Sequence, residues 1–306
     1  GATIKSQATF SQFSDIASAW IGDLLTLDAS NLYQYNGLYK DSLSVIGNYI
    51  DPTLTPIPLD TPWNWIGYLP TQSLKVNDAL MSIEASNGDI IKSQLHFAQY
   101  LDGVGWIGNL KSMSAPNGYL LKLSNIDTLI YPDPLDFKGD ENSEARNPIV
   151  PDYHGLTEIS ATPTAFLPYA RWQVNPSKYE FSMNAIAIVA ENGIDHNMLQ
   201  DGDEVAAFVQ NEVRGSGKAI YIPALKSYMI FMTMYANEAG ENMVLRYYNA
   251  SNNQEYDLLE KVNFKINNIL GFVDKPVIWH LGAVTGVDDL ASSQGFRLYP
   301  NPFTNA

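Results

Sequence analysis

Short stretches in which apolar and polar residues alternate fill much of the chain, and turn-forming residues separate one stretch from the next. A period of two is typical of β-strands, because successive side chains point to opposite faces of a sheet. The clearest candidate strands in the second half are Met183–Ala190, Glu204–Gln210, Ala219–Ile222, Tyr228–Tyr235 and Met243–Asn249. The pattern predicts an all-β protein made of tandem antiparallel β-sandwich-like modules, with at most short helices.

The candidate strand Tyr228–Tyr235 departs from simple alternation, because both of its faces are apolar. Such a strand is expected between two packed layers, so we place it at the centre of its domain. The preceding Gly215-Ser216-Gly217 is typical of a hairpin turn.

One segment has the spacing of a helix. Its apolar residues recur on one helical face at Val76, Ala79, Leu80 and Ile83. Ser73 is the candidate N-cap, and Asn87-Gly88 supplies a stop signal. We therefore expect a short helix after Ser73.

A sequence pattern in the first 33 residues occurs a second time further along the chain. Ile-Lys-Ser-Gln is identical at 4–7 and 91–94, and the other matched pairs are Phe10 with Phe97, Trp20 with Trp106 and Tyr33 with Tyr119. The offset falls from 87 to 86 because one residue is inserted before Trp20. Repetition at this spacing predicts a modular array in which the first copy packs against the second.

The repeat and the composition between candidate strands predict the domain limits. Residues 1–52 are a partial copy of a β repeat of about 86 residues, 53–62 a proline-rich connector, 63–135 a full copy, 136–163 an acidic linker, 164–283 a second β-sandwich domain, and 284–306 a linker with the start of another domain. The chain begins inside a repeat and shows no signal peptide, so we expect it to be a fragment of a longer protein.

Composition narrows the classes of function. The chain has 306 residues and a net charge of −15, which argues against partners that need basic patches, such as nucleic acid or an anionic membrane surface. No apolar run approaches the roughly 20 residues that span a bilayer. The acidic balance suits a secreted protein or one that recruits cations.

Motifs for catalysis are missing from the sequence. There is no cysteine, and the four histidines show no zinc-binding spacing. No Gly-x-Ser-x-Gly elbow occurs, and a carboxylate pair for glycoside cleavage has no local signature. We therefore predict a protein that is not an enzyme.

Three Trp-Ile-Gly triplets begin at Trp20, Trp65 and Trp106. In one interpretation the indole rings are stacking platforms for sugar. In the other they are core residues, and each glycine permits close backbone approach. Repetition favours the core interpretation, but we retain Trp20, Trp106 and Tyr119 as candidate ligand-binding residues.

Charged residues supply two further candidates. Asp201, Asp203 and Glu204 surround a glycine turn and could bind Ca²⁺, which prefers oxygen ligands, although the full spacing of a calcium loop is absent. The alternative is a solvated acidic turn. Arg214 could hold the carboxylate of a ligand, or form a structural ion pair, which we prefer.

The last residues, Phe296-Arg297-Leu298-Tyr299-Pro300-Asn301-Pro302, resemble the opening of the C-terminal sorting domain of cargo of the Bacteroidetes type IX secretion system. The resemblance implies that the parent protein uses the type IX machinery as a partner. It also implies export across the outer membrane, followed by release or by anchoring at the cell surface.

Upstream modules also look like units that precede this sorting domain in large surface proteins. The matching stretches are 63–68 with 88–94, and 201–208 with Arg214-Gly215. The resemblance implies a destination but no reaction.

We therefore expect a non-enzymatic segment of a secreted or cell-surface protein that acts in adhesion or in binding a ligand, either a glycan or another surface protein. One alternative is a structural stalk that spaces a distal domain from the sorting signal. Another is an accessory module of a secreted hydrolase.

Overall fold

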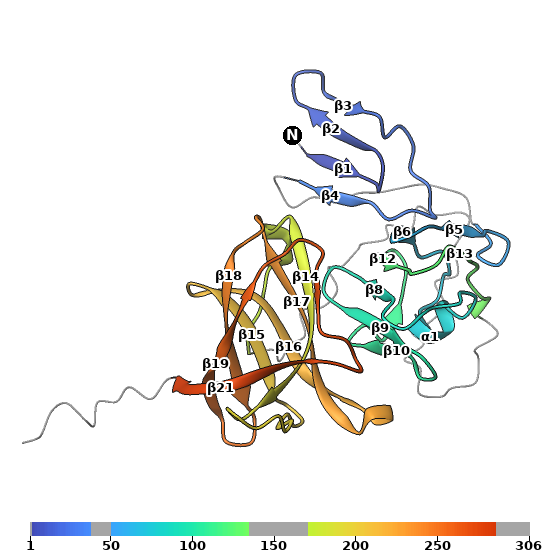
Figure 1. Cartoon of the computed structure of the whole chain (residues 1–306). Helices are drawn as coiled ribbons and strands as arrows, with labels where there is room; N and C mark the ends of the chain where they lie inside the picture. The colour runs from blue at the N-terminus through green and yellow to red at the C-terminus, as the bar shows by residue number, and fades with distance from the viewer. Residues whose placement is uncertain (1, 38–49, 135–170, 286–306) are drawn as a thin grey trace, which may run out of the picture.

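The computed structural model describes residues 2–37, 50–134 and 171–285 and shows three β-rich units along the chain (Figure 1). The expected all-β fold is confirmed. No helix in these ranges is long and apolar enough to cross a bilayer. The predicted acidic linker and the terminal segment with Phe296–Pro302 lie almost wholly outside the described residues.

The first repeat is a four-stranded antiparallel sheet in the order β3-β2-β1-β4. Its strands are β1 (Thr3–Lys5), β2 (Phe10–Ser14), β3 (Ala19–Gly22) and β4 (Gln34–Asn36).

The second repeat contains a five-stranded sheet in the order β10-β9-β8-β12-β6, with the two-stranded pairs β7–β11 and β5–β13 beside it. Its elements are β5 (Ile57–Leu59), β6 (Trp63–Gly67), β7 (Leu74–Lys75), α1 (Val76–Ala79), β8 (Ile90–Lys92), β9 (Phe97–Leu101), β10 (Gly105–Gly108), β11 (Ser112–Met113), β12 (Gly118–Lys122) and β13 (Asp127–Leu129). Strand β5 lies inside the segment predicted to be a connector.

A short helix is confirmed, but both of its predicted ends are wrong: it ends at Ala79, before Leu80, Ile83 and the predicted stop at Asn87-Gly88. It begins after Lys75 and has four residues. Ser73 lies before β7, and its hydroxyl donates to the carbonyl of Met113, 3.0 Å away. The pairing of β7 with β11 holds Ser73 in an extended segment, so its side chain cannot cap the helix.

The two repeats share strand register as well as sequence. The pairs Ile4–Ser11, Ile4–Tyr35 and Phe13–Trp20 in the first sheet correspond to Ile91–Ala98, Ile91–Leu121 and Tyr100–Trp106 in the second. The insertion before Trp20 falls between β2 and β3, where a longer turn leaves the register unchanged. The predicted repeat is therefore a structural repeat.

A side chain fixes the end of the β2–β3 hairpin in the same way in both copies. The Phe10 N–H donates to Asp23 Oδ1 at 2.9 Å, and the Phe97 N–H donates to Asn109 Oδ1 at 2.8 Å. The Asp or Asn after the triplets at Trp20 and Trp106 thus satisfies a backbone donor at the start of the neighbouring strand.

The glycines of the triplets permit close backbone approach, as one interpretation of the sequence proposed. A Cβ added at Gly22 or Gly108 would lie 2.2 or 2.1 Å from the carbonyl oxygen of Phe10 or Phe97. A Cβ at Gly67 would lie 1.9 Å from the carbonyl oxygen of Ala29. Any side chain at these positions would force strands or repeats apart.

The third unit is a closed barrel, one form of the sandwich-like β-rich packing predicted. Seven strands run in the order β17-β16-β15-β18-β19-β21-β14, and β14 pairs again with β17, while β20 extends β14. The elements are η2 (Pro176–Lys178), β14 (Phe181–Ala190), β15 (Glu204–Val209), β16 (Glu212–Ile222), η3 (Pro223–Leu225), β17 (Ser227–Ala236), β18 (Asn242–Asn249), β19 (Gln254–Asn263), β20 (Ile269–Leu270) and β21 (Val277–Thr285).

The prediction of a hairpin turn at Gly215-Ser216-Gly217 is wrong, because these residues lie inside β16. A Cβ at Gly215 would lie 2.4 Å from the carbonyl oxygen of Thr233, and one at Gly217 would lie 2.7 Å from that of Phe231. The glycines let β16 approach β17 closely instead of turning the chain.

The central position of β17 is confirmed. Ile230, Met232 and Met234 point into the barrel core. Met229 and Phe231 point outward and pack against the second repeat. Each apolar face of the strand is therefore covered by its own layer.

The first repeat packs against the outer edge of β6, as expected from the repetition. The side chain of Gln7 donates to the Trp63 carbonyl at 2.7 Å and accepts the Trp65 N–H at 2.9 Å. Ser30 accepts the Gly67 N–H at 2.8 Å, next to the site of close approach. The Leu32 N–H also donates to the Trp65 carbonyl at 3.2 Å, so the Gln7 amide and the segment 30–32 together occupy the place that a neighbouring strand would take.

Replacing Gln7 by alanine should loosen this edge. The Trp65 N–H would lose its acceptor, and hydrogen exchange at this amide should accelerate about fivefold, since one hydrogen bond contributes about 1 kcal/mol. The control is Gln12→Ala, an exposed glutamine of the same sheet. Equal exchange rates for Trp65 in both variants would contradict the role of Gln7.

Candidate functional site

Each sheet of the repeat has two faces, which the registers define. In the first repeat, the Phe10 face carries Thr3, Lys5, Phe10, Gln12 and Ile21, and the Trp20 face carries Ile4, Phe13, Trp20 and Tyr35. In the second repeat, the Phe97 face carries Ile90, Lys92, Phe97, Gln99 and Ile107, and the Trp106 face carries Ile91, Ala98, Tyr100, Trp106 and Leu121.

The Phe10 face is open, whereas its counterpart is covered. Phe10 and Ile21 are 55% and 57% exposed, but Phe97 and Ile107 are 0% and 7% exposed. The difference arises because the Phe97 face packs against the barrel, next to β14 and β17 (Figure 1). The first repeat therefore presents an apolar sheet face of a kind that this chain buries elsewhere.

The Trp20 face is likewise more exposed than the Trp106 face. Trp20 is 46% exposed and meets Phe13 edge-on at 5.6 Å, while Trp106 is 8% exposed and meets Tyr100 edge-on at 5.4 Å. Trp106 lies in the core beneath α1, as the core interpretation predicted. The matching aromatic pairs show that sequence alone does not decide which indole is covered.

Tyr119 is also buried, and its hydroxyl accepts the Ser114 N–H at 2.9 Å. Tyr33 accepts the Asp28 N–H at 2.7 Å in the first repeat. This tyrosine therefore closes the same loop in both copies. Tyr119 and Trp106 share one core, whereas Trp20 lies on a different sheet.

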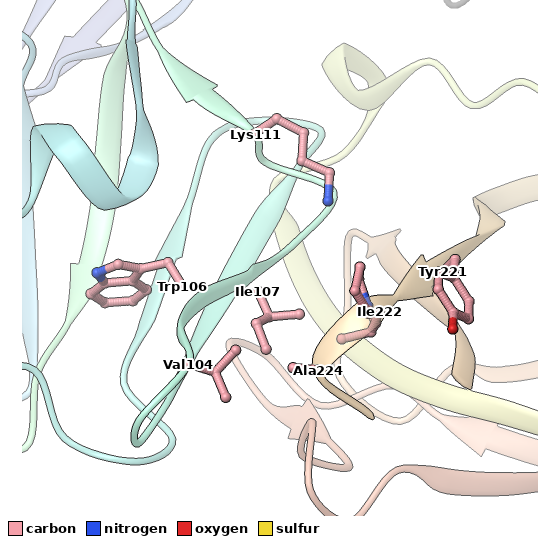
Figure 2. A pocket seen from close by; sticks show the side chains of 8 residues that line it. Val104, Trp106, Ile107, Lys111, Tyr221, Ile222 and Ala224 are labelled. Atoms are coloured by element: carbon pink, nitrogen blue, oxygen red, sulfur yellow. The ribbon is translucent and has the colours of Figure 1, made fainter. Parts of the chain in front are cut away.

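A cleft of about 300 Å³ lies between β10 of the second repeat and the end of β16 in the barrel. Figure 2 shows Val104 and Ile107 facing Ile222 and Ala224, with the Lys111 side chain above them, whereas the Trp106 ring turns away. Burial lowers the pKa of Lys111. The cleft is small and partly apolar, and the candidate ligand residues do not converge on it.

Comparison with known proteins gives no relative. No protein-family model matches the chain, and no curated protein or solved structure matches it significantly. The function must therefore be argued from the geometry of the chain itself.

Arg214 lies in a network within the barrel unit. Its guanidinium is 3.0 Å from Glu241, 3.5 Å from Glu212 and 4.7 Å from the centre of the Tyr179 ring. The structural ion pair that we preferred is present. The hydroxyl of Tyr235 donates to the Gln94 carbonyl, which ties this part of the barrel to the second repeat.

The acidic turn holds one of its carboxylates in a buried set of donors. Asp203 Oδ1 accepts the Ala250 N–H at 2.9 Å, and Oδ2 accepts the Gln200 N–H at 2.8 Å and the Tyr247 hydroxyl at 2.7 Å. Asp201 is exposed. A calcium ion at Asp203 would have to displace these donors, and calcium binding here stays a prediction.

Glu204 is the first residue of β15 and directly follows Asp203. Because side chains alternate along extended chain, Glu204 points to the side opposite Asp203. It accepts the Arg171 N–H at 3.1 Å and the Trp172 N–H at 3.3 Å. Burial raises the pKa of Glu204. Among the described residues, no group of three or more His, Asp or Glu side chains is arranged to hold a metal ion.

The second repeat contains the same turn at Gly88-Asp89. Asp89 Oδ2 accepts the Ser86 N–H at 2.8 Å, just as Asp203 accepts the N–H three residues before it. Gly88 and Gly202 have φ angles of +91° and +84°. A glycine with positive φ followed by a buried aspartate is therefore a structural turn that precedes a strand in both units.

His280 lies between two carboxylates at the end of the barrel. Its Nδ1 is 2.6 Å from Glu260 Oε1, and its Nε2 is 3.6 Å from Asp195 Oδ1. The hydrogen bond to Glu260 raises the pKa of His280. The arrangement favours an imidazolium in an ion pair, whereas a general base must be neutral.

Lys92 is the charged group at the junction of the second repeat and the barrel. Its Nζ donates to Ser182 Oγ at 3.2 Å and lies 5.0 Å from the centre of the Trp63 ring. Burial lowers the pKa of Lys92 from 10.5 to about 8. At neutral pH the junction therefore holds a charge that would be more stable in water.

Sequence reasoning found Trp20 but missed Phe10, Gln12 and Ile21 as a surface. The signal was present in the alignment of the two copies, where Phe10 matches Phe97. It could not reveal that one copy is covered and the other open.

Asp203→Asn should destabilise the barrel, because the new amide N–H₂ would face a hydrogen-bond donor. We expect the free energy of unfolding to fall by about 1–3 kcal/mol. Chemical denaturation should be measured with calcium and with EDTA, and the exposed Asp201→Asn is the control. A loss seen only with calcium would instead identify Asp203 as a metal ligand.

Lys92→Met should stabilise the protein at pH 7. Between pH 8 and 10.5 the unfolded chain binds more protons than the folded one, so the destabilising contribution of Lys92 shrinks as pH rises. Unfolding should be followed from pH 7 to 9.5, below the range in which buried tyrosines with raised pKa values, such as Tyr131, oppose this trend.

The stabilisation by Lys92→Met should be largest at pH 7, at most about 3 kcal/mol, and smaller at pH 9.5. Lys5→Met changes the equivalent, half-buried lysine of the first sheet and serves as the control. A gain that does not depend on pH would contradict the assignment.

Proposed function

We propose that the protein is a non-enzymatic docking segment of a secreted or cell-surface protein, and that the Phe10 face is its binding surface. The observation that carries the proposal is the exposure of Phe10 and Ile21 at positions where Phe97 and Ile107 are buried against another domain. The resemblance of Phe296–Pro302 to a type IX sorting signal supports the location.

The second repeat supports this function because its equivalent face already serves as a docking surface. Burying the exposed halves of Phe10 and Ile21 would contribute about 1 kcal/mol each. Two such contributions fall short of the roughly 4 kcal/mol that corresponds to millimolar binding. The polar positions of the face, Lys5 and Gln12, must therefore also contact the partner.

The Trp20 face supports a second candidate, the binding of a glycan. Trp20 and Tyr35 are 46% and 44% exposed and lie on the two outer strands of the sheet. Aromatic rings on a flat sheet can stack on sugar rings. In this candidate the Phe10 face of the sheet would bind protein, and the Trp20 face would bind carbohydrate.

A rigid stalk is the alternative from a different class. The edge of β6 holds the first repeat through Gln7, and the Phe97 face holds the barrel. These contacts join the three described units directly. They suit a spacer as well as a docking platform, so the two functions must be separated by binding.

The two faces should be tested separately. Phe10→Ser/Ile21→Ser alters one face and Trp20→Ser/Tyr35→Ser the other, while Leu54→Ser/Ile126→Ser changes exposed apolar residues outside the first sheet. Interferometry should compare the full-length variants on immobilised polysaccharides and on the surface-protein fraction of the organism that produces the protein.

We expect only Phe10→Ser/Ile21→Ser to reduce binding to the protein fraction, by at least tenfold. Loss of polysaccharide binding in Trp20→Ser/Tyr35→Ser would support the glycan candidate. Binding that no variant changes would sink both docking proposals and favour the stalk.

A further inference from the structure

The Phe10 and Phe97 faces share a set of identical side chains at their centre. Four positions are identical, namely Lys5 and Lys92, Phe10 and Phe97, Gln12 and Gln99, and Ile21 and Ile107. Other positions differ: Thr3, Ser14, Asp23, Gln34 and Asn36 stand where the second repeat has Ile90, Leu101, Asn109, Leu120 and Lys122. The chain itself therefore contains an example of what such a face binds.

In the second repeat the partner is the outer surface of the barrel. Phe97 and Ile107 form one apolar cluster with barrel residues that include Ile186, Met229 and Phe231. The rings of Phe97 and Phe231 are 5.6 Å apart. This contact is a sheet face packed on a sheet face, in which β14 and β17 supply the apolar residues.

Polar side chains fix the position of the barrel on this face. Gln99 Oε1 accepts the Val273 N–H at 2.7 Å, and Asn109 Nδ2 donates to the Phe231 carbonyl at 3.1 Å. Lys92 reaches Ser182 on β14. Glutamine and lysine recur at the same places on the Phe10 face, where the described residues provide no barrel to contact them.

We propose that the Phe10 face docks the outer β14–β17 type of surface of a second barrel domain, one of the same kind as residues 171–285, in the arrangement that the second repeat uses. The proposal rests on the proposed function and names the class of partner. Its occupant is a β-barrel domain with an apolar sheet face, not a peptide or a sugar.

Asp23 distinguishes this partner from the chain's own barrel. Asn109 accepts the Phe97 N–H through its oxygen and donates to the Phe231 carbonyl through its nitrogen. Asp23 accepts the Phe10 N–H through one oxygen, so its second oxygen would face that carbonyl without a proton between them. Two acceptor oxygens that face each other in this way repel. The chain's own barrel therefore binds the second repeat in preference to the first.

The partner of the Phe10 face must therefore carry a hydrogen-bond donor where the chain's own barrel has the Phe231 carbonyl. An N–H, a hydroxyl or a cationic side chain would pair with Asp23. Asp23 is thus a specificity-determining residue, and Phe10, Gln12 and Ile21 provide the part of the face that both partners share.

The first test uses the full chain and grafts two of the differences, one apolar and one polar, onto the second repeat. Hydrogen exchange at the Val273 N–H, which Gln99 accepts, reports docking of the barrel, and amides of β15 report whether the barrel stays folded. Phe97→Ser/Ile107→Ser, the released-barrel variant, is the reference for lost docking.

Ile90→Thr should keep the Val273 protection within about tenfold of the parent, and Asn109→Asp should lower it about a hundredfold. Exchange in Ile90→Thr as fast as in the released-barrel variant would overturn the partner class. Unchanged exchange in Asn109→Asp would overturn the role of Asp23.

The second test supplies the exposed barrel surface in trans. The full-length released-barrel variant is the probe, and interferometry compares its binding to the parent chain, to Asp23→Asn and to Asp23→Asn/Phe10→Ser. We expect Asp23→Asn to bind the probe at least tenfold more tightly than the parent, and Phe10→Ser to abolish the gain.

If Asp23→Asn fails to bind a probe whose barrel is released by the exchange criterion, the barrel-docking proposal is wrong. The panel in the preceding section would still decide separately whether the Phe10 face binds any partner, because that panel does not involve the chain's own barrel.

Discussion

The packing of the Phe97 face on the outside of β14 and β17 is the contact on which the arrangement of the described units depends. The barrel closes through β14 and β17, and these strands carry apolar residues on both sides. Their inner side fills the barrel, so their outer side needs a cover of its own. The second repeat provides this cover and buries Lys92 in doing so, at a cost that the apolar contact must offset.

The sequence predicted the strands whose apolar residues alternate or run together. It found the cores of β14, β15, β17 and β18, and it found the repeat and the residues that match between its copies. Strands β19 and β21 escaped, because Gln254–Asn263 carries charged residues at many positions and has weak alternation. Glycine serves both turns and close strand contacts, and only the position of β17 shows that Gly215-Ser216-Gly217 belongs to the second kind.

The candidate site was harder to predict, for a physical reason. Trp20 and Trp106 occupy equivalent positions, yet their burial differs because burial depends on the layer that covers the sheet. Likewise, Asp203 has the composition of a metal ligand, but the Tyr247 hydroxyl and two backbone N–H groups engage it. These donors come from segments that a local pattern cannot connect. The alignment of the copies was informative because one copy serves as a control for the other.

The amide of Gln7 has a consequence for arrays of this repeat. It pairs with Trp63 and Trp65 as a peptide group would, but it ends there instead of continuing as a strand. Together with the segment 30–32, which hydrogen-bonds to Trp65 and Gly67, it closes the edge of β6 to further strand addition, the usual route from native sheets to fibrils. If each repeat sealed its successor in this way, lengthening the array would add mass and binding faces without adding β6-type edges prone to aggregation.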